Sequence, residues 1–188
     1  MALRRLKNDE VYRLYLASPL AFADWENPTT DELNANPTND PNGLIFNLTC
    51  ALSQDDSQFD LDDPELDDSL TFCQSAGTSE VLSRSATIVY TAERSKLRWT
   101  PASSTDAEDG YNTANLAFSL LAWRGIDYFA IMSVGKASDA AFAVDDRIKM
   151  AEVSTDWGID LTGTGESLRL QQTFAKRTKL NWNHKLTA

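Results

Sequence analysis

Acidic side chains are the residues of this sequence that are numerous and close enough to suggest chemistry. Residues 55–68 hold eight Asp or Glu in fourteen positions, and a glycoside hydrolase needs two carboxyl groups, one of which has a raised pKa. Carboxylate oxygens also bind calcium, but the stretch lacks the glycine that lets an EF-hand loop turn. Because acids this crowded stay ionised in water, the sequence favours a solvated loop or an interaction arm over either site.

Other side chains that commonly carry chemistry are few. His184 is the single histidine, and as a general base it needs a nucleophile and an orienting acid nearby in space. Two cysteines and one histidine cannot complete a tetrahedral zinc site without a carboxylate. Gly163-Thr164-Gly165 matches part of a dinucleotide fingerprint, but Leu168 stands where a third glycine is needed, so a glycine hairpin explains it better. We therefore expect no enzyme activity, no cofactor and no metal.

The compartment is indicated by the cysteines and by the first residues. Cys50 and Cys73 allow at most one disulfide, and two reduced, buried thiols are the favoured interpretation. The basic start is followed at once by Asp9 and Glu10, which argues against a signal peptide. No uninterrupted apolar stretch reaches the roughly 20 residues of a membrane span. We expect a soluble protein that makes no contact with a membrane.

Charge is distributed unevenly along the 188 residues, which carry a net charge of −11. Between Arg13 and Arg84 there are fourteen acids and no base, whereas residues 168–188 carry five bases and no acid. An acidic protein does not grip a nucleic-acid backbone, because phosphate binding depends on Lys and Arg, but DNA can pass along an acidic surface without sticking. Opposite charges at distant points of one chain suit a subunit that binds copies of itself.

The apolar pattern predicts a mainly β protein. Alternating or β-branched runs predict strands at residues 44–52, 70–74, 86–91, 127–134, 147–153, 168–174 and 179–186. In the first strand the even-numbered residues from Phe46 to Leu52, Cys50 among them, are expected on one face. In the fourth, the odd-numbered residues from Phe129 to Ser133 are expected together. Seven or eight short strands with one flanking helix predict a β-sandwich or barrel-like domain.

The helix is predicted near residues 113–123, where Leu116, Leu120 and Trp123 recur at helical spacing. Gly125 then ends it, because glycine tolerates the left-handed conformation. Four prolines interrupt regular structure up to residue 41. Residues 1–41 are therefore predicted to be an extended N-terminal arm and loop, with the apolar piece 11–16 in the arm. Residues 42–188 are predicted to be the sandwich domain, with an acidic loop at 55–68.

The five tryptophans are scattered rather than evenly spaced. Aromatic residues are enriched in cores and interfaces, and these tryptophans form no regular alternation with bases along the chain. They are therefore interpreted as core or interface anchors and not as a platform for nucleotide bases: Trp25, Trp99, Trp123, Trp157 and Trp182.

The order of these elements resembles the major tail protein, or tail tube subunit, of bacteriophages with long non-contractile tails. The segment Pro28-Thr29-Thr30-Asp31-Glu32-Leu33-Asn34-Ala35 is similar to a proline-led Glu-(Ile/Leu)-Asn-Ala segment before the first core strand of that family. Residues 48–52 and 70–73 resemble two of its strands, and the Ala-rich helix that passes directly into residues 127–132 resembles its helix-to-strand step. The Gly-rich turn and the final strands from Leu168 also fit, whereas the acidic stretch 55–68 has no match.

This resemblance implies a phage tail tube fold and a structural subunit without catalytic function. Copies would form hexameric rings stacked into a tube, assembled in the host cytoplasm as part of the virion, with a lumen through which DNA is ejected without specific binding. Its partners would be other copies, the tape-measure protein, the tail terminator and distal tail proteins. A carbohydrate- or calcium-binding β-sandwich adhesion module stays open as the alternative.

The charge distribution also suggests where copies meet. We expect the base-rich end or the basic start of one copy to dock against acids between Asp24 and Asp68 of the next, which would set register and polarity. The candidate inter-subunit contacts are Arg4, Arg5, Arg13, Asp62, Asp63, Asp67, Asp68, Arg169, Lys176, Arg177 and Lys179.

Overall fold

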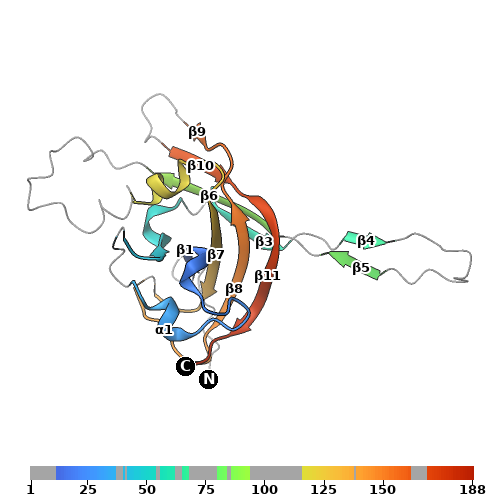
Figure 1. Cartoon of the computed structure of the whole chain (residues 1–188). Coiled ribbons are helices and arrows are strands. Elements are labelled where there is room, and N and C mark those ends of the chain that lie inside the picture. The colour runs from blue at the N-terminus through green and yellow to red at the C-terminus, as the bar shows by residue number, and fades with distance from the viewer. Residues whose placement is uncertain are drawn as a thin grey trace, which may run out of the picture.

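The protein is built from antiparallel strands in two packed sheets and a separate ribbon (Figure 1). The structure is a computed structural model, and it describes residues 12–36, 40, 42–53, 56–61, 65–67, 80–83, 86–93, 116–137, 139–161 and 169–188. The strands are β1 (Tyr12–Ala17), β2 (Ile45–Asn47), β3 (Gln58–Leu61), β4 (Glu65–Asp67), β5 (Glu80–Ser83), β6 (Ala86–Glu93), β7 (Asp127–Val134), β8 (Arg147–Ser154), β9 (Ile159–Leu161), β10 (Arg169–Thr173) and β11 (Ala175–Lys185). The helical elements are η2 (Pro19–Ala21), α1 (Thr30–Leu33), η3 (Thr49–Ala51) and residues 116–121.

Within the described residues, a five-stranded sheet has the order β11-β8-β7-β1-β2 and a four-stranded sheet the order β3-β6-β10-β9. The ribbon of β4 and β5 lies away from both (Figure 1). The predicted mainly β fold is confirmed. The predicted strands at 86–91, 127–134, 147–153 and 168–174 correspond to β6, β7, β8 and β10, and β11 begins four residues earlier than the predicted 179. The predicted strand at 70–74 lies outside the described residues.

The five-stranded sheet is covered on both faces. Residues 128–133 of β7 are all buried, and alternate side chains enter two different clusters because successive residues of a strand point to opposite faces. Tyr128, Ala130 and Met132 face the four-stranded sheet. Phe129 and Ile131 pack on the other face with residues of η2, α1 and the loop around Phe142. The predicted shared face of the odd-numbered residues is therefore confirmed.

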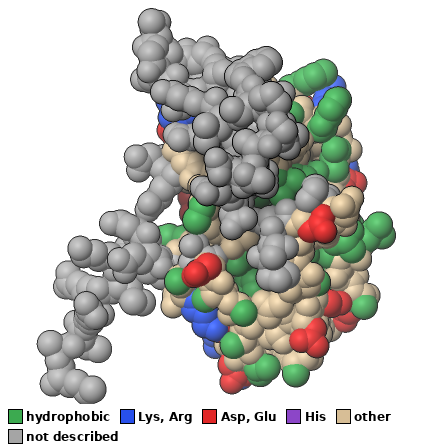
Figure 2. Space-filling model, turned by 90° about the vertical axis from the view of Figure 1, so that its left-hand side faces the viewer, with side chains coloured by type: hydrophobic (Ala, Val, Ile, Leu, Met, Phe, Trp, Pro, Cys, Tyr) green, Lys and Arg blue, Asp and Glu red, His purple; other side chains and the backbone are tan. Residues whose placement is uncertain are grey.

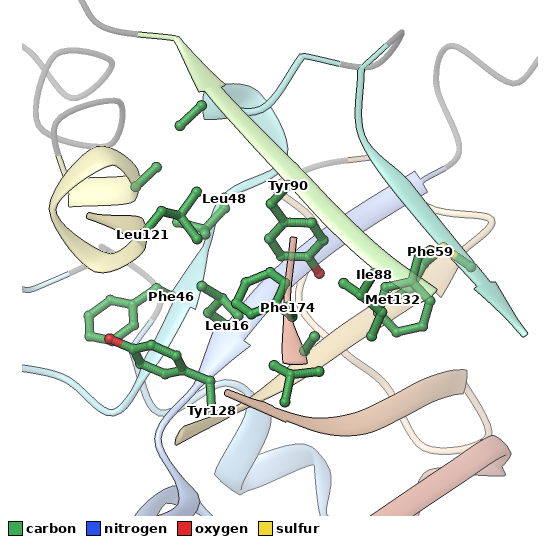
Figure 3. Close-up of a cluster of buried hydrophobic side chains, with 14 of the residues drawn as sticks. Leu16, Phe46, Leu48, Phe59, Ile88, Tyr90, Leu121, Tyr128, Met132 and Phe174 are labelled. Carbon is green, nitrogen blue, oxygen red and sulfur yellow. The ribbon is translucent and has the colours of Figure 1, made fainter. Parts of the chain in front are cut away.

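The two sheets that enclose the core are connected directly by two consecutive strands, one in each sheet. β10 passes into β11 through Phe174, whose N–H donates to the oxygen of Ile88 at 3.1 Å. The Phe174 ring meets the Tyr90 ring edge-on, with 5.3 Å between centroids. Figure 3 shows both rings beside Leu16 of β1, in the middle of the buried cluster. Because one continuous chain crosses from sheet to sheet, the sandwich is barrel-like at this edge.

The predicted strand 44–52 is wrong in its second half, since β2 ends at Asn47 and η3 follows. The Asn47 Oδ1 atom accepts hydrogen bonds from the N–H and the hydroxyl of Thr49 at 3.1 and 2.7 Å. Such a local bond competes with a strand and turns the chain. As a result Phe46 and Leu48 are buried, but Cys50 is exposed and not, as predicted, beneath the same face.

The beginning of the described chain also differs from the prediction. Residues 11–16 were expected in an extended arm, but β1 lies inside the five-stranded sheet between β7 and β2. Its Leu16 enters one core cluster and its Tyr15 the other, so this strand is buried on both faces instead of being a free arm. Residues 1–11 lie outside the described residues. Among those described, no helix has the length and apolar content needed to cross a bilayer.

The loop before β2 contains α1, which the sequence analysis missed although its capping box was visible in Thr29-Thr30-Asp31-Glu32. The Thr29 hydroxyl caps the Glu32 N–H, and the Glu32 carboxylate accepts from the Thr29 N–H at 2.9 Å. The other Glu32 oxygen accepts from the Ala23 N–H at 2.8 Å. These reciprocal bonds hold a four-residue helix that would not form alone.

We predict that Thr29→Ala lowers the free energy of unfolding by about 1 kcal/mol, because an N-cap hydroxyl is lost. Urea denaturation with an unchanged slope would measure it. Thr187→Ala is the matched control, since Thr187 is exposed and its backbone oxygen, not its side chain, accepts from the Thr30 N–H. Equal losses in the two variants would contradict the assigned cap.

The helix at residues 116–121 and the acidic stretch differ in detail from the predictions. Ala117 and Leu121 form the buried face, whereas Trp123 is exposed because the helix ends before it. Gly125 has the expected positive φ of 77°. Part of the predicted acidic loop forms the strands β3 and β4. In β3, Phe59 points into the core beside Ile88 while its polar neighbours face water, which is the alternation of a half-buried strand.

Candidate assembly surfaces

The four-stranded sheet has one face in the core and one face turned outward. Phe59, Ile88, Tyr90 and Leu170 are buried on the core side. Most outward side chains are exposed or half-buried and almost all of these are uncharged: Gln58, Asp60, Thr87, Val89, Gln171 and Thr173. Thr91, on the same side, is buried, and its hydroxyl donates to the Asp56 oxygen at 2.8 Å. Arg169 is the base on this side among the described residues, and its guanidinium pairs with Asp56 at 2.5 Å. The result is a polar surface with a slight acidic character.

The sheets also end in unpaired strands within the described part of the chain. β11 and β2 form the edges of the five-stranded sheet, and β3 and β9 those of the four-stranded sheet. An edge strand presents free N–H and C=O groups to which another strand can add. These edges are therefore available to a further copy of the chain.

The predicted contact residues of the base-rich end mostly pair inside their own subunit. Arg177 lies 3.0 Å from Asp127, and Lys179 lies 3.3 Å from Glu152. The Asp127 pKa is lowered by hydrogen bonds from Ser154 and Arg177 and by the charge of Arg177, while slight burial opposes this. Arg169, predicted to dock on acids of an adjacent copy, pairs with Asp56 of its own chain. Such half-exposed pairs contribute little to stability and can exchange partners.

The remaining candidates are only partly visible. Arg4, Arg5, Asp62, Asp63 and Asp68 lie outside the described residues. Asp67 lies in β4 and Lys176 in β11. On the face shown in Figure 2, acidic side chains are scattered among hydrophobic and other side chains.

Arg13 is buried, with 0% of its surface exposed, and it is held inside its own subunit. Its guanidinium donates to the Ala140 oxygen at 2.6 Å and to the Ser133 hydroxyl at 2.9 Å, and it lies 3.8 Å from the Asp146 carboxylate. It also lies 4.2 Å from the centroid of the Phe142 ring. Arg13 thus ties β1 and β7 to the loop that covers them, and this burial removes it from the set of candidate inter-subunit contacts.

Asp146 is the acid of this cluster. Partial burial alone would raise its pKa, but hydrogen bonds from Lys136 and the Ala143 N–H and the charges of Lys136 and Arg13 lower the pKa below the ordinary 3.8. A lowered pKa in the folded state stabilises the fold above the unfolded-state pKa, and this contribution disappears as the pH falls through the folded-state pKa.

Asp146→Asn should therefore lower the free energy of unfolding at pH 7 by about 1–2 kcal/mol, the usual contribution of hydrogen bonds to a charged group. The difference from the unaltered chain should shrink as the pH falls below about 4 and vanish at lower pH. Denaturation between pH 2.5 and 7, on the order of five steps, measures it. The control Asp156→Asn changes an exposed acid and should cause little change in the free energy of unfolding at any pH. A loss of stability in Asp146→Asn that does not depend on pH would contradict the lowered pKa assigned to Asp146.

The tryptophans divide into packed and exposed residues, which sequence reasoning did not separate. Trp25 stacks on Phe129 with 6.2 Å between ring centroids, and Trp182 packs against Phe59 at 5.6 Å. Trp123 and Trp157 are 68% and 72% exposed. Trp99 lies outside the described residues. Only the surface tryptophans are interface candidates, since packed ones already contribute to the fold.

A groove of about 610 Å³ opens where the two sheets diverge. Leu14, Met132 and Val134 of the five-stranded sheet line one side, and Phe59 of β3 and residues of η3 line the other. Asp60 and Lys149 bring charges of opposite sign to this lining. The groove therefore has an apolar floor and a polar rim.

A sandwich with unpaired sheet edges, one bare polar face and exposed aromatic residues is typical of a subunit that is completed by its neighbours in an assembly. Residues 1–186 match the family model described as phage tail tube protein, so the chain belongs to this family. It is a structural subunit of a phage tail tube and a component of the virion, and such subunits self-assemble into a tube. No curated protein matches the chain.

Proposed function

We propose that this chain forms hexameric rings that stack into a tail tube, and that phage DNA is ejected through the lumen. The observation that carries the proposal is the polar outward face of the four-stranded sheet. Among the described residues, the middle strands of the five-stranded sheet, β1 and β7, are packed on both faces by elements of their own chain, so the middle of that sheet offers no face to a channel. The polar outward face of the four-stranded sheet is suited to line a water-filled bore.

The four-stranded sheet also has free edges on opposite sides, β3 and β9, within the described residues. In our proposal β9 of one copy pairs antiparallel with β3 of the next. Repetition around a ring closes the sheets into one barrel and satisfies the edge groups of every copy. An interface of this head-to-tail kind forms a closed ring when its rotation divides the circle evenly.

Electrostatics supports the same arrangement. A cationic wall would bind each phosphate in turn and retard transit, whereas an acidic or neutral wall leaves DNA hydrated. The outward face carries Asp60, and its described base, Arg169, is neutralised by Asp56. The net charge of −11 agrees with this choice of lumen wall. DNA would therefore pass without specific binding.

The other expected partners follow from the place of a tube in a tail. The tube would enclose a tape-measure protein, meet a tail terminator and distal tail proteins at its ends, and assemble in the host cytoplasm. The ribbon of β4 and β5 lies away from the sheets (Figure 1). We propose that Asp67 of β4 and the acids that adjoin this strand in the sequence, Asp62, Asp63 and Asp68, contact Arg4, Arg5 or Lys176 of a neighbouring copy. No catalytic step is part of this function.

Electron microscopy of the purified, full-length chain tests the proposal. We expect rings of six subunits that stack into hollow tubes, with the four-stranded sheet innermost. A solid filament, or a bore lined by the covering loops of the five-stranded sheet, would contradict it. The adhesion-module alternative instead requires a monomer whose melting temperature rises with calcium or glycan.

A further inference from the structure

Two exposed tryptophans lie on one locked corner of the subunit. The Gly125 N–H donates to the Thr155 oxygen at 2.8 Å, and the Thr155 N–H donates to the Ile126 oxygen at 2.9 Å. These bonds hold residues 123–126 beside residues 155–159. We call the exposed side chains of this corner the tryptophan knob: Trp123, Arg124, Ile126, Asp156, Trp157 and Ile159.

The knob is preorganised for contact. The Arg124 guanidinium lies 5.4 Å from the centroid of the Trp157 ring and its Nε lies 3.1 Å from Asp156. Two tryptophans that are 68% and 72% exposed place a large apolar area in water, and aromatic anchors flanked by an arginine are typical of interface hot spots. A rigid anchor loses little conformational entropy on binding.

We propose that the tryptophan knob of one copy inserts into the groove between the sheets of the next copy in the ring. This rests on the proposed function, in which β9 joins β3 of a neighbour. The knob adjoins β9 at Ile159, and the groove is lined by Ser57 and by residues 58–60 of β3. The two surfaces lie on opposite edges of one sheet, as a head-to-tail contact requires.

Strand register places the two surfaces at the same height. Ile159 pairs with Gln171, and Gln171 pairs with Thr91. Gln58 pairs with Val89, two residues from Thr91. Trp157 stands two residues before Ile159, so it lies level with Gln58 of the next copy when the sheets join without a step in register.

The chemistry of the two surfaces is complementary. The apolar floor of the groove, formed by Leu14, Met132 and Val134, matches the indole ring of Trp157. The knob carries Arg124 and Asp156, and the groove carries Asp60 and Lys149. Because each surface carries one base and one acid, the docked orientation that brings opposite charges together is favoured over the reverse one.

The first test removes the anchors. Trp123→Ala/Trp157→Ala should raise the concentration needed for assembly at least tenfold, as for hot-spot residues, while the melting temperature of the monomer hardly changes because both side chains are exposed. The matched control is Leu20→Ala, an exposed apolar residue on η2 that should assemble like the unaltered chain. Val134→Trp, which fills the groove from within, should also block assembly.

A mixture of the two defective proteins gives the sharper readout. The knobless double variant keeps its groove and the Val134→Trp variant keeps its knob, so together they should form dimers of one copy each and nothing larger. Sedimentation measures this. A mixture that stays monomeric overturns the proposed contact. A knobless variant that forms tubes at the normal concentration also overturns the contact but leaves the tail tube function intact. A native chain that forms no tubes overturns both the contact and the proposed tail tube function.

A cross-link tests the geometry directly. Asp156→Cys/Cys73→Ser retains Cys50, which lines the groove, and a bifunctional maleimide should link assembled copies into a ladder on a denaturing gel. The control adds Cys50→Ser and should give no ladder. Assembled copies that still run only at the mass of one chain would show that position 156 does not lie beside the groove of the next copy, which overturns the proposal.

Discussion

Replacing Arg13 with alanine should lower the free energy of unfolding by about 3–5 kcal/mol, the largest loss expected from any single substitution outside the hydrophobic core. The change deprives the Ala140 oxygen and the Ser133 hydroxyl of a buried donor and leaves a cavity beside Phe142. Asp146 keeps its bond to Lys136 at 2.6 Å, so the acid is not left unpaired. We therefore expect a loss in the lower half of this range of unfolding free energies. Chemical denaturation at pH 7 measures the loss.

Two further variants separate the causes of this effect. Arg13→Met retains most of the packing volume but no donor, so it should recover the cavity part of the loss and not the hydrogen-bond part. Arg177→Ala removes an arginine of β11 whose side chain is 50% exposed, and it should change stability by no more than about 0.5 kcal/mol. If Arg13→Ala lost less than about 1 kcal/mol, the role assigned to this cluster would be wrong.

Three lysines on the proposed lumen wall should slow DNA ejection by at least about a hundredfold at low salt. The variant is Thr87→Lys/Gln171→Lys/Thr173→Lys, at outward positions of the four-stranded sheet. Around one proposed ring this adds more bases than the roughly 6–10 phosphate contacts that make DNA binding strong and salt-dependent. Tubes should still assemble, because these side chains face away from the core.

The rate of DNA release after triggering, followed with a DNA-binding dye, measures this effect, and added salt should partly restore it. The matched control is Leu20→Lys/Ala141→Lys/Val144→Lys, which adds the same charge to exposed positions on the layer that covers the five-stranded sheet. Normal ejection in the first variant and slow ejection in the control would mean that the opposite side of the subunit lines the bore.

The assembly surfaces show how far local patterns extend. The sequence indicated that the tryptophans are core or interface anchors, yet Trp123 was assigned to the helix face on spacing alone. In the structure the helix ends at residue 121 and Trp123 is exposed beside Trp157. Whether an aromatic residue packs inside or remains for a partner depends on what the rest of the chain has already covered, which spacing does not encode.

Charge gives the same lesson. The uneven distribution of acids and bases predicts contacts between copies, but Arg169, Arg177 and Lys179 pair within their own chain in the structure. Residues distant in sequence become neighbours when antiparallel strands pair, as β11 does with β8 in the five-stranded sheet. The composition shows that pairs will form, and the topology decides between partners of the same copy and partners of another.

The sequence by itself determined the mainly β class, the positions of β6, β7, β8 and β10, and the family resemblance, because alternation and turn residues act over a few positions. Only the tertiary structure decided that β1 lies inside a sheet, that Arg13 is buried, and that the four-stranded sheet keeps a bare face. These three features depend on contacts between residues far apart in the chain, such as Arg13 and Ser133, which are 120 positions apart. Burial results from such contacts and is not a property of either residue alone.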